Sequence, residues 1–170
     1  EYIFEDFVAG FLEQHFSNDW KVEYQKSNEY LSTNPQAFNM QHDIFLTSKD
    51  SEKRKIIIET KYKLRSKEFK KDIKKEIAQS DLYQVTSYAF RRGCTDVILI
   101  YPNLTDTINV PDVFEIRSGF NSEVKIKITA MEIPFWEVNN LNVSKLETKL
   151  KTTLKEQLDK IKNKTSTIHS

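Results

Sequence analysis

The stretch Lys55-Ile56-Ile57-Ile58-Glu59-Thr60-Lys61-Tyr62-Lys63 begins as a run of isoleucines and ends in an acid and a base two positions apart. Side chains alternate between the faces of a strand, so Glu59 and Lys61 point the same way and Thr60 points the other way. On an exposed strand such a pair is an ordinary surface ion pair. At the end of a buried strand it is typical of metal-dependent phosphodiester hydrolysis. The rest of the chain decides between these readings.

The composition describes one globular domain with a heavily charged exterior. The chain has 170 residues, of which 38% are hydrophobic and 30% charged, and its net charge is +1. No apolar run approaches the ~20 residues of a membrane span. The single cysteine, Cys94, fits a reducing cytosol and is expected to be a small packing residue. Because the chain opens at Glu1 without a methionine or any signal-peptide pattern, we expect it to be a domain of a longer protein.

Charge is distributed unevenly along the chain. Residues 1–32 carry seven acids and two lysines, whereas residues 49–75 carry twelve bases and five acids. Positive charge is thus concentrated around the Glu59/Lys61 strand, as a phosphate-binding surface requires. A solvated, mobile loop is the alternative reading. The candidate DNA-binding side chains are Lys63, Arg65, Lys67, Lys70, Lys71, Lys74 and Lys75.

Periodicity predicts an α/β (α+β) fold in the order helix, three strands, helix, strand, followed by a β-rich extension and a C-terminal helix. The predicted helices cover residues 2–16, 73–92 and 144–164, with Gly93 as a C-terminal cap and Ser144 and Glu147 as a capping box. The predicted strands cover residues 20–24, 38–46, 56–59, 96–101, 113–117 and 124–131, and residues 28–36 are read as turns. We expect one domain over 1–164 (core 1–102, extension 103–142) and a flexible tail over 165–170.

Two further carboxylates are expected near Glu59. Asp43 is embedded in an apolar strand, where an unpaired carboxylate is costly to bury, and a hairpin would let Asp43 and Glu59 converge on one cation. The Thr60 carbonyl is a further candidate ligand. On the first helix, Glu5 lies on the flank of the apolar face and is predicted to reach an outer metal shell, whereas Asp6 points to solvent.

The second helix adds Gln84 and Tyr88, which share one face because they are four residues apart, with Asp81 close to Gln84. Both side chains could hydrogen-bond a phosphate or orient a water molecule. Simple packing is the alternative, since Gln79 and Tyr83 have the same spacing.

The helix acid, Asp43, Glu59-x-Lys61 and Gln84-x-x-x-Tyr88 together resemble the PD-(D/E)xK nuclease superfamily, in its RecB-like branch. The order of these motifs over residues 1–102 is more narrowly similar to the nuclease domain of the McrC family, the cleavage subunits of McrBC-type restriction systems. From Asn103 onward the resemblance is weak. Where that family usually has a proline before the aspartate, this chain has His42, which we expect to point away from Asp43.

This resemblance implies a restriction-endonuclease-like core, a central mixed sheet flanked by helices, and a cytoplasmic prokaryotic enzyme that cleaves double-stranded DNA with Mg²⁺, or Mn²⁺ in its place. It implies recruitment by a McrB-like AAA+ GTPase through an N-terminal region outside this chain, and transient pairing of two nuclease domains on DNA, without a membrane partner. Asp43, Glu59, Lys61, Gln84, Tyr88 and Glu5 would form the catalytic set. The alternatives are a RecB-like exonuclease, a transposon end-cleaving nuclease and a catalytically silent DNA-binding scaffold.

Overall fold

The computed structural model describes residues 2–24, 29–65, 71–105, 108–121, 123–135 and 143–164. The predicted tail at 165–170 lies outside them. The described helices are α1 (Tyr2–Phe16), α2 (Gln79–Arg92) and α3 (Val143–Lys162). The described strands are β1 (Trp20–Tyr24), β2 (Tyr30–Thr33), β3 (Gln36–Asn39), β4 (Ile44–Ser48), β5 (Lys55–Thr60), β6 (Asp96–Asn103), β7 (Asp112–Arg117) and β8 (Lys125–Pro134).

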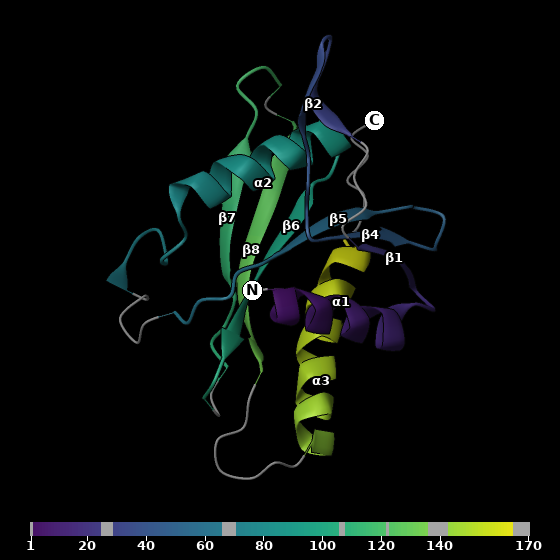
Figure 1. Cartoon of the computed structure of the whole chain (residues 1–170), viewed down its shortest axis with the longest axis vertical. Coiled ribbons are helices and arrows are strands. Elements are labelled where there is room, and N and C mark those ends of the chain that lie inside the picture. Colours follow the sequence, from purple (N-terminus) through teal and green to yellow (C-terminus); the bar gives the residue numbers. More distant parts are fainter. Residues whose placement is uncertain are drawn as a thin grey trace.

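Six strands form one mixed sheet in the order β1-β4-β5-β6-β8-β7 (Figure 1). β1 and β5 run antiparallel to β4, β6 lies parallel to both β5 and β8, and β7 closes the far edge antiparallel to β8. The isoleucine run of β5 therefore occupies a central position, where continuous apolar sequence is expected. The predicted mixed sheet flanked by helices is confirmed.

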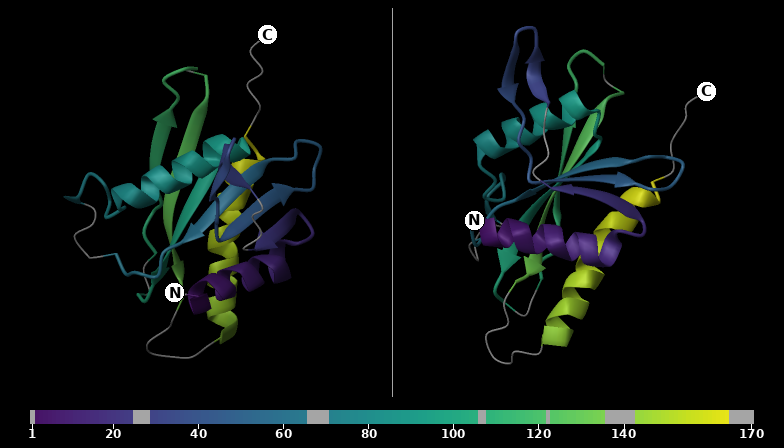
Figure 2. Two further views of the ribbon diagram at one scale, coloured as in Figure 1. Left: turned by 45° about the horizontal axis from the view of Figure 1, so that its top comes forward. Right: turned by 45° about the vertical axis from the view of Figure 1, so that its right-hand side comes forward.

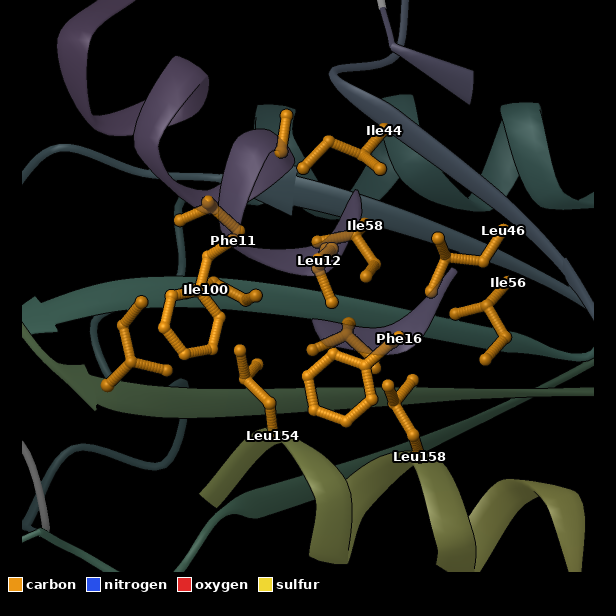
Figure 3. Close-up of a cluster of buried hydrophobic side chains, with 14 of the residues drawn as sticks. Phe11, Leu12, Phe16, Ile44, Leu46, Ile56, Ile58, Ile100, Leu154 and Leu158 are labelled. Atoms are coloured by element: carbon orange, nitrogen blue, oxygen red, sulfur yellow. The ribbon is translucent and has the colours of Figure 1, made fainter. Parts of the chain in front are cut away.

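The helices lie on both faces of this sheet (Figure 2). α1 and α3 pack against one face, where Phe11, Leu12, Phe16, Leu154 and Leu158 meet isoleucines of β4, β5 and β6 (Figure 3). α2 packs against the other face through Val85 and Ala89, in the same cluster as Ile57. Since side chains alternate along β5, Ile56 and Ile58 face α1 and α3, and the odd-numbered positions face α2. Glu59 and Lys61 are thereby directed toward α2.

The structure corrects the prediction for residues 28–46. Within the turn-rich segment, β2 and β3 form a separate two-stranded ribbon, and the predicted single strand over 38–46 is divided between β3 and β4. The backbone of Phe38 has a φ of 61°, which interrupts an extended chain, and Asp43 precedes the first residue of β4.

Both later helices have different starts from those predicted. α2 begins at Gln79 and not at residue 73, because Lys75 and Glu76 have positive φ values of 51° and 57°, which a right-handed helix does not accommodate. α3 begins at Val143, so Ser144 lies inside the helix and the predicted capping box is wrong. The sequence predicts an apolar stripe of Leu146, Leu150, Leu154, Leu158 and Ile161 on this helix; the last four are buried against the sheet, and Leu146 is half-buried.

Two smaller predictions are confirmed. Gly93 ends α2 in the left-handed region with a φ of 64°, where its N–H bonds back to the last turn. Cys94 is buried and its pKa is raised to about 12 by that burial, so it is a packing residue and not a nucleophile. In the described part of the chain, none of the helices has the length and apolar character that crossing a membrane would require.

Candidate active site

Asp43 is fixed against the end of β5. Its Oδ2 accepts hydrogen bonds from the backbone N–H and the hydroxyl of Thr60, each at 2.7 Å. The antiparallel ladder pairs Ile44 with Ile58, so the next position outward brings Asp43 opposite Glu59. Directly opposed residues of antiparallel strands lie on the same face. Extending the register by one position thus places both side chains on the same face, and their convergence on one cation stays a prediction.

Glu59 is a buried carboxylate that is only partly compensated. Glu59 is 5% exposed, and its Oε2 atom has no hydrogen-bond partner within the described residues. Burial, followed by the negative charge of Asp43, raises the pKa of Glu59 from 4.5 to about 7, and the adjacent Lys61 opposes this rise. Two acids that share one site hinder each other's ionisation, which a bound cation would relieve.

Lys61 lies between two carboxylates. Its Nζ is 3.3 Å from Glu59 Oε1 and 3.2 Å from Asp81 Oδ1, with the side chain 15% exposed. Burial lowers the pKa of Lys61, but the charges of Glu59 and Asp81 outweigh this effect and raise it above its ordinary value. Lys61 is consequently a cation at neutral pH. Asp81 was not assigned a role from the sequence, although its position one turn before Gln84 on the same helix face was the available signal.

Gln84 and Tyr88 lie on the same face of α2, half-buried, and the Gln84 amide donates a 3.1 Å hydrogen bond to the Tyr88 hydroxyl. The Tyr88 ring also lies 6.5 Å from the ring of His42. His42 is 1% exposed, and both of its ring nitrogens lack hydrogen-bond partners among the described residues. Burial, followed by the charge of Arg92, lowers the pKa of His42 to about 4. His42 is therefore a neutral packing residue between Phe45 and Tyr88, unsuited to proton transfer at neutral pH.

α1 brings acids to the same end of the sheet. Glu5 is 5% exposed and Asp6 is exposed, as the helical pattern predicts. The Tyr24 hydroxyl donates a hydrogen bond to Asp6, and burial, this hydrogen bond and the charges of Glu5, Asp6 and Asp43 raise the pKa of Tyr24. Tyr24 is a residue of this region that is not among the predicted site residues. Its signal was its place at the end of β1, opposite Ile44, next to Asp43.

The basic segment after β5 is less uniform than predicted. Lys71 and Lys74 are exposed, and Lys63 donates a 2.9 Å hydrogen bond to the Glu76 carbonyl. The structure does not support Arg65 as a DNA-binding side chain. Its side chain is 1% exposed, and its guanidinium donates a 2.7 Å hydrogen bond to Asp112. A guanidinium in that position is a structural ion pair and does not face a ligand. Lys67 and Lys70 lie outside the described residues.

The donor set for a cation is small. Across the described ranges, no three or more His, Cys, Asp or Glu side chains are grouped as a metal site. Asp43 and Glu59 form a pair of oxygen donors from neighbouring strands, with Glu5 on the adjacent helix. A pair of carboxylates suits a hard cation that retains water and substrate oxygens, and it does not suit zinc, which prefers nitrogen and sulfur ligands.

Sequence comparison gives this site a family. Residues 1–102 match the model of the McrBC 5-methylcytosine restriction system component, which is more than half of the chain. The chain belongs to the McrBC family. The matched residues are those over which the motifs resemble that family, so the sequence-based assignment is confirmed. No curated protein matches the chain.

A solved structure shares the fold of this McrBC family member. It is the refined half-complex from a tetradecameric assembly of Thermococcus gammatolerans McrB AAA+ hexamers with bound McrC. The TM-score is 0.61 at 15% sequence identity, and the match covers 92% of this chain and 33% of the other. The similarity thus extends beyond residue 102 to most of the mixed α/β fold, and the chain spans about a third of the length of the matched chain.

Proposed function

We propose that this chain is the nuclease domain of an McrC-type subunit, with a PD-(D/E)xK core that hydrolyses phosphodiester bonds of double-stranded DNA. The observation that carries the proposal is the Glu59 carboxylate. It is buried beside Asp43, its pKa is raised to about 7, and its Oε2 is left without a partner among the described residues. Structural acids are normally satisfied when buried, and an unsatisfied one at a strand end is typical of a functional site.

The donors present fit Mg²⁺, with Mn²⁺ as a substitute. Mg²⁺ is usually bound by one or two carboxylates together with waters and phosphate oxygens, and Asp43 and Glu59 supply those two carboxylates. The Thr60 carbonyl and Glu5 are the proposed additional inner and outer ligands. When bound there, the ion would supply Lewis-acid activation of the phosphate and of the attacking water.

The protein's own groups have separate tasks in this proposal. Lys61 carries a fixed positive charge beside the carboxylates and stabilises the charge that develops on the phosphate. Asp81, at 3.2 Å, keeps Lys61 in place from the α2 side. Gln84 and Tyr88, already joined by a hydrogen bond, orient the phosphate or the nucleophilic water. Because Gln84 and Tyr88 are hydrogen-bonded to each other, substrate binding would move the two side chains together.

We further propose a McrB-like AAA+ GTPase as the partner that delivers this domain to DNA. The structural neighbour contains McrC bound to McrB hexamers, and this chain spans about a third of the matched chain. Cleavage of both strands requires two active sites, so two copies are proposed to act together on DNA in the cytoplasm. Lys63, Lys71, Lys74 and Lys75 are the proposed phosphate contacts within the described residues, and Lys67 and Lys70 remain predictions from the sequence.

The test is Mg²⁺-dependent DNA cleavage by the complete protein with its motor subunit. Asp43→Asn and Lys61→Met should each lower the cleavage rate by roughly 100-fold or more while retaining the fold. Lys155→Met, at an exposed position of α3, is the matched control and should cleave as the wild type does. Undiminished cleavage by both site variants would place the active site elsewhere. DNA binding without cleavage by the wild type under all metal conditions would instead favour the silent scaffold.

A further inference from the structure

A buried tyrosine of β6 lies beside Lys61, on the face of the sheet that α2 covers. The parallel ladder pairs Thr60 with Ile100, and the Lys61 N–H donates a 2.8 Å hydrogen bond to the Ile100 carbonyl. The next position of this register places Tyr101 beside Lys61. Tyr101 also belongs to the buried cluster that packs against α2. It is therefore a core residue directly beside the candidate active site.

The Tyr101 hydroxyl is buried without a hydrogen bond. Tyr101 is 0% exposed, and its hydroxyl has no partner among the described residues. A phenylalanine would fill the same space without burying a polar group, so the hydroxyl is costly in this arrangement. Burial, followed by the negative charge of Asp81, raises the pKa of Tyr101 to about 12. The hydroxyl therefore keeps its proton at neutral pH and can act as a hydrogen-bond donor.

The ring of Tyr101 has a fixed position. Lys63 Nζ lies 5.8 Å and Arg65 Cζ 5.4 Å from the ring centroid, and cations at these distances are attracted to an aromatic face. Arg65 is held in turn by its ion pair with Asp112. A partner for the hydroxyl must therefore be a nearby side chain that can exchange one contact for another.

Asp81 is the acceptor that best suits this hydroxyl. Its Oδ1 lies 3.2 Å from the Nζ of Lys61, the neighbour of Tyr101 in the ladder. Glu76 is the other acid whose charge acts on the hydroxyl, and its effect is smaller than that of Asp81. Arg65 has no acceptor atom in its side chain. Asp81 is thus a carboxylate close to both Lys61 and Tyr101, and it is bonded to Lys61.

Lys61 is poorly placed to serve a phosphate while two carboxylates hold it. Its Nζ is 3.3 Å from Glu59 and 3.2 Å from Asp81, so one positive charge faces two acidic side chains. A phosphate that approaches this group meets little net positive charge. Both carboxylates therefore need other partners when substrate binds. The proposed metal ion would be the partner of Glu59, and the Tyr101 hydroxyl is available for Asp81.

We propose that Tyr101 is a positioning residue, whose hydroxyl donates a hydrogen bond to Asp81 when Lys61 turns from Asp81 to a DNA phosphate. This proposal rests on the proposed function. Until the phosphate arrives, Asp81 keeps Lys61 in place. Afterwards, the hydrogen bond from Tyr101 offsets part of the cost of separating Asp81 from Lys61, and the charge of Lys61 becomes available to the phosphate.

The first experiment measures stability by urea denaturation of the complete protein, with Tyr101→Phe placed in the wild type and in Lys61→Met. In the wild type, the substitution should leave the equilibrium constant for unfolding unchanged or lower it, because the hydroxyl has no partner to lose. In Lys61→Met, Asp81 has lost its lysine and should accept from the hydroxyl permanently. Tyr101→Phe should then raise that constant about fivefold. Tyr83→Phe, which removes an exposed hydroxyl bonded to Gln79 on the same helix as Asp81, is the matched control and should act equally in both backgrounds.

The second experiment measures DNA affinity without cleavage. The same four proteins are titrated with duplex DNA in Ca²⁺ in place of Mg²⁺. Tyr101→Phe should weaken binding about fivefold in the wild-type background, because the bound state loses one hydrogen bond. It should leave the affinity of Lys61→Met unchanged, since the hydroxyl is bonded there with or without DNA. A hydroxyl with a merely structural role would change the affinity of both backgrounds alike.

Each outcome bears on the role of Tyr101. Effects that depend on the presence of Lys61 in both measurements support the proposal. An equal loss of stability in the two backgrounds would overturn it, because the hydroxyl would then be bonded before substrate arrives. Unchanged DNA affinity of Tyr101→Phe in the wild-type background would overturn it as well. A wild type that binds DNA without cleaving it would count against the nuclease function alone, since neither measurement depends on turnover.

Discussion

Two buried polar clusters lie near the carboxyl ends of the parallel strands, and they are built differently. In the first, the Glu132 cluster, Glu132 Oε2 accepts hydrogen bonds from Asn103 at 2.6 Å and Asn109 at 2.9 Å, and Arg65 pairs with Asp112. In the second, the site cluster of Asp43, Glu59, Lys61 and Asp81, Glu59 retains an unsatisfied oxygen and a raised pKa.

The difference indicates what each cluster is for. A polar network whose acids are fully bonded ties strands together and costs little to maintain. A network that leaves one buried carboxylate uncompensated is destabilising by itself, and such sites persist where ligand binding or chemistry uses the charge. The Glu132 cluster is accordingly expected to contribute to stability, and the site cluster to function at a cost in stability.

The largest effect should come from breaking the Glu132 cluster. Glu132→Ala removes the acceptor of two amides and one of the carboxylates near Arg65, which should lower the free energy of unfolding by about 3 kcal/mol. Urea denaturation measures the loss. Glu123→Ala, at an exposed turn position, is the control and should change it by less than about 0.5 kcal/mol. Equal effects of the two substitutions would remove the structural role assigned to this cluster.

Glu59→Gln is expected to raise the free energy of unfolding, whereas Glu132→Ala lowers it. The pKa of Glu59 rises from 4.5 to about 7, and each unit corresponds to about 1.4 kcal/mol, so replacing the carboxylate with an amide should stabilise the fold by up to about 3 kcal/mol at pH 8. The same variant should be inactive in cleavage. Urea denaturation at pH 8 gives the stability. A loss of stability at pH 8 would show that the charged form of Glu59 supports the fold.

The pH dependence sharpens this prediction. Since the folded pKa of Glu59 lies above its unfolded value, its contribution to stability is present below about pH 4.5 and is lost as the pH rises through about 7. The pKa of His42 is lowered from 6.5 to about 4, so its contribution is present above pH 6.5 and is lost as the pH falls toward 4. In the wild type, a fall in pH therefore increases the stability contribution of Glu59 and decreases that of His42. Glu59→Gln should therefore lose stability faster on acidification, by up to about 1 kcal/mol per pH unit between 6.5 and 5. Parallel unfolding curves for wild type and variant across this range would contradict the assignment.

The smallest effect concerns the metal. At a Mg²⁺ concentration about five times its dissociation constant, the wild type should gain about 1 kcal/mol in stability, visible as a rise in melting temperature. Glu59→Gln should show no gain. Glu132→Ala, although less stable, should retain the full gain because its cluster is not part of the site. An equal response of all three proteins would mean that the ion binds elsewhere.

Much of the site was predictable because its geometry follows from short-range rules. The ladder between β4 and β5 follows from their apolar sequences, and strand alternation then brings Asp43 and Glu59 to one end and turns Lys61 toward α2. Helical periodicity likewise predicts the burial of Glu5 and the pairing of Gln84 with Tyr88. These relations depend on residues within one element or on two neighbouring strands.

The features that escaped prediction depend on distant partners or on backbone conformation. Arg65 resembles its basic neighbours in sequence, and only the arrival of Asp112 and Glu132 on β7 and β8 buries it. The ribbon lacks an apolar pattern, because its strands are short and largely exposed, and the positive φ of Phe38 leaves no signature in sequence. Asp81 was visible on the helix face, but its pairing with Lys61 required the position of α2 over the sheet.

The junction of β6 with β8 has a consequence for preparing this protein. The family match ends at residue 102, within β6, yet all eight residues of β6 are buried and pair with β8. A fragment that stops at the end of the match would present the apolar strand β6 as an edge with its amides and carbonyls unpaired, an arrangement that promotes aggregation between sheet edges. Recombinant fragments intended to stay monodisperse should continue through β8 and the α3 stripe that covers it.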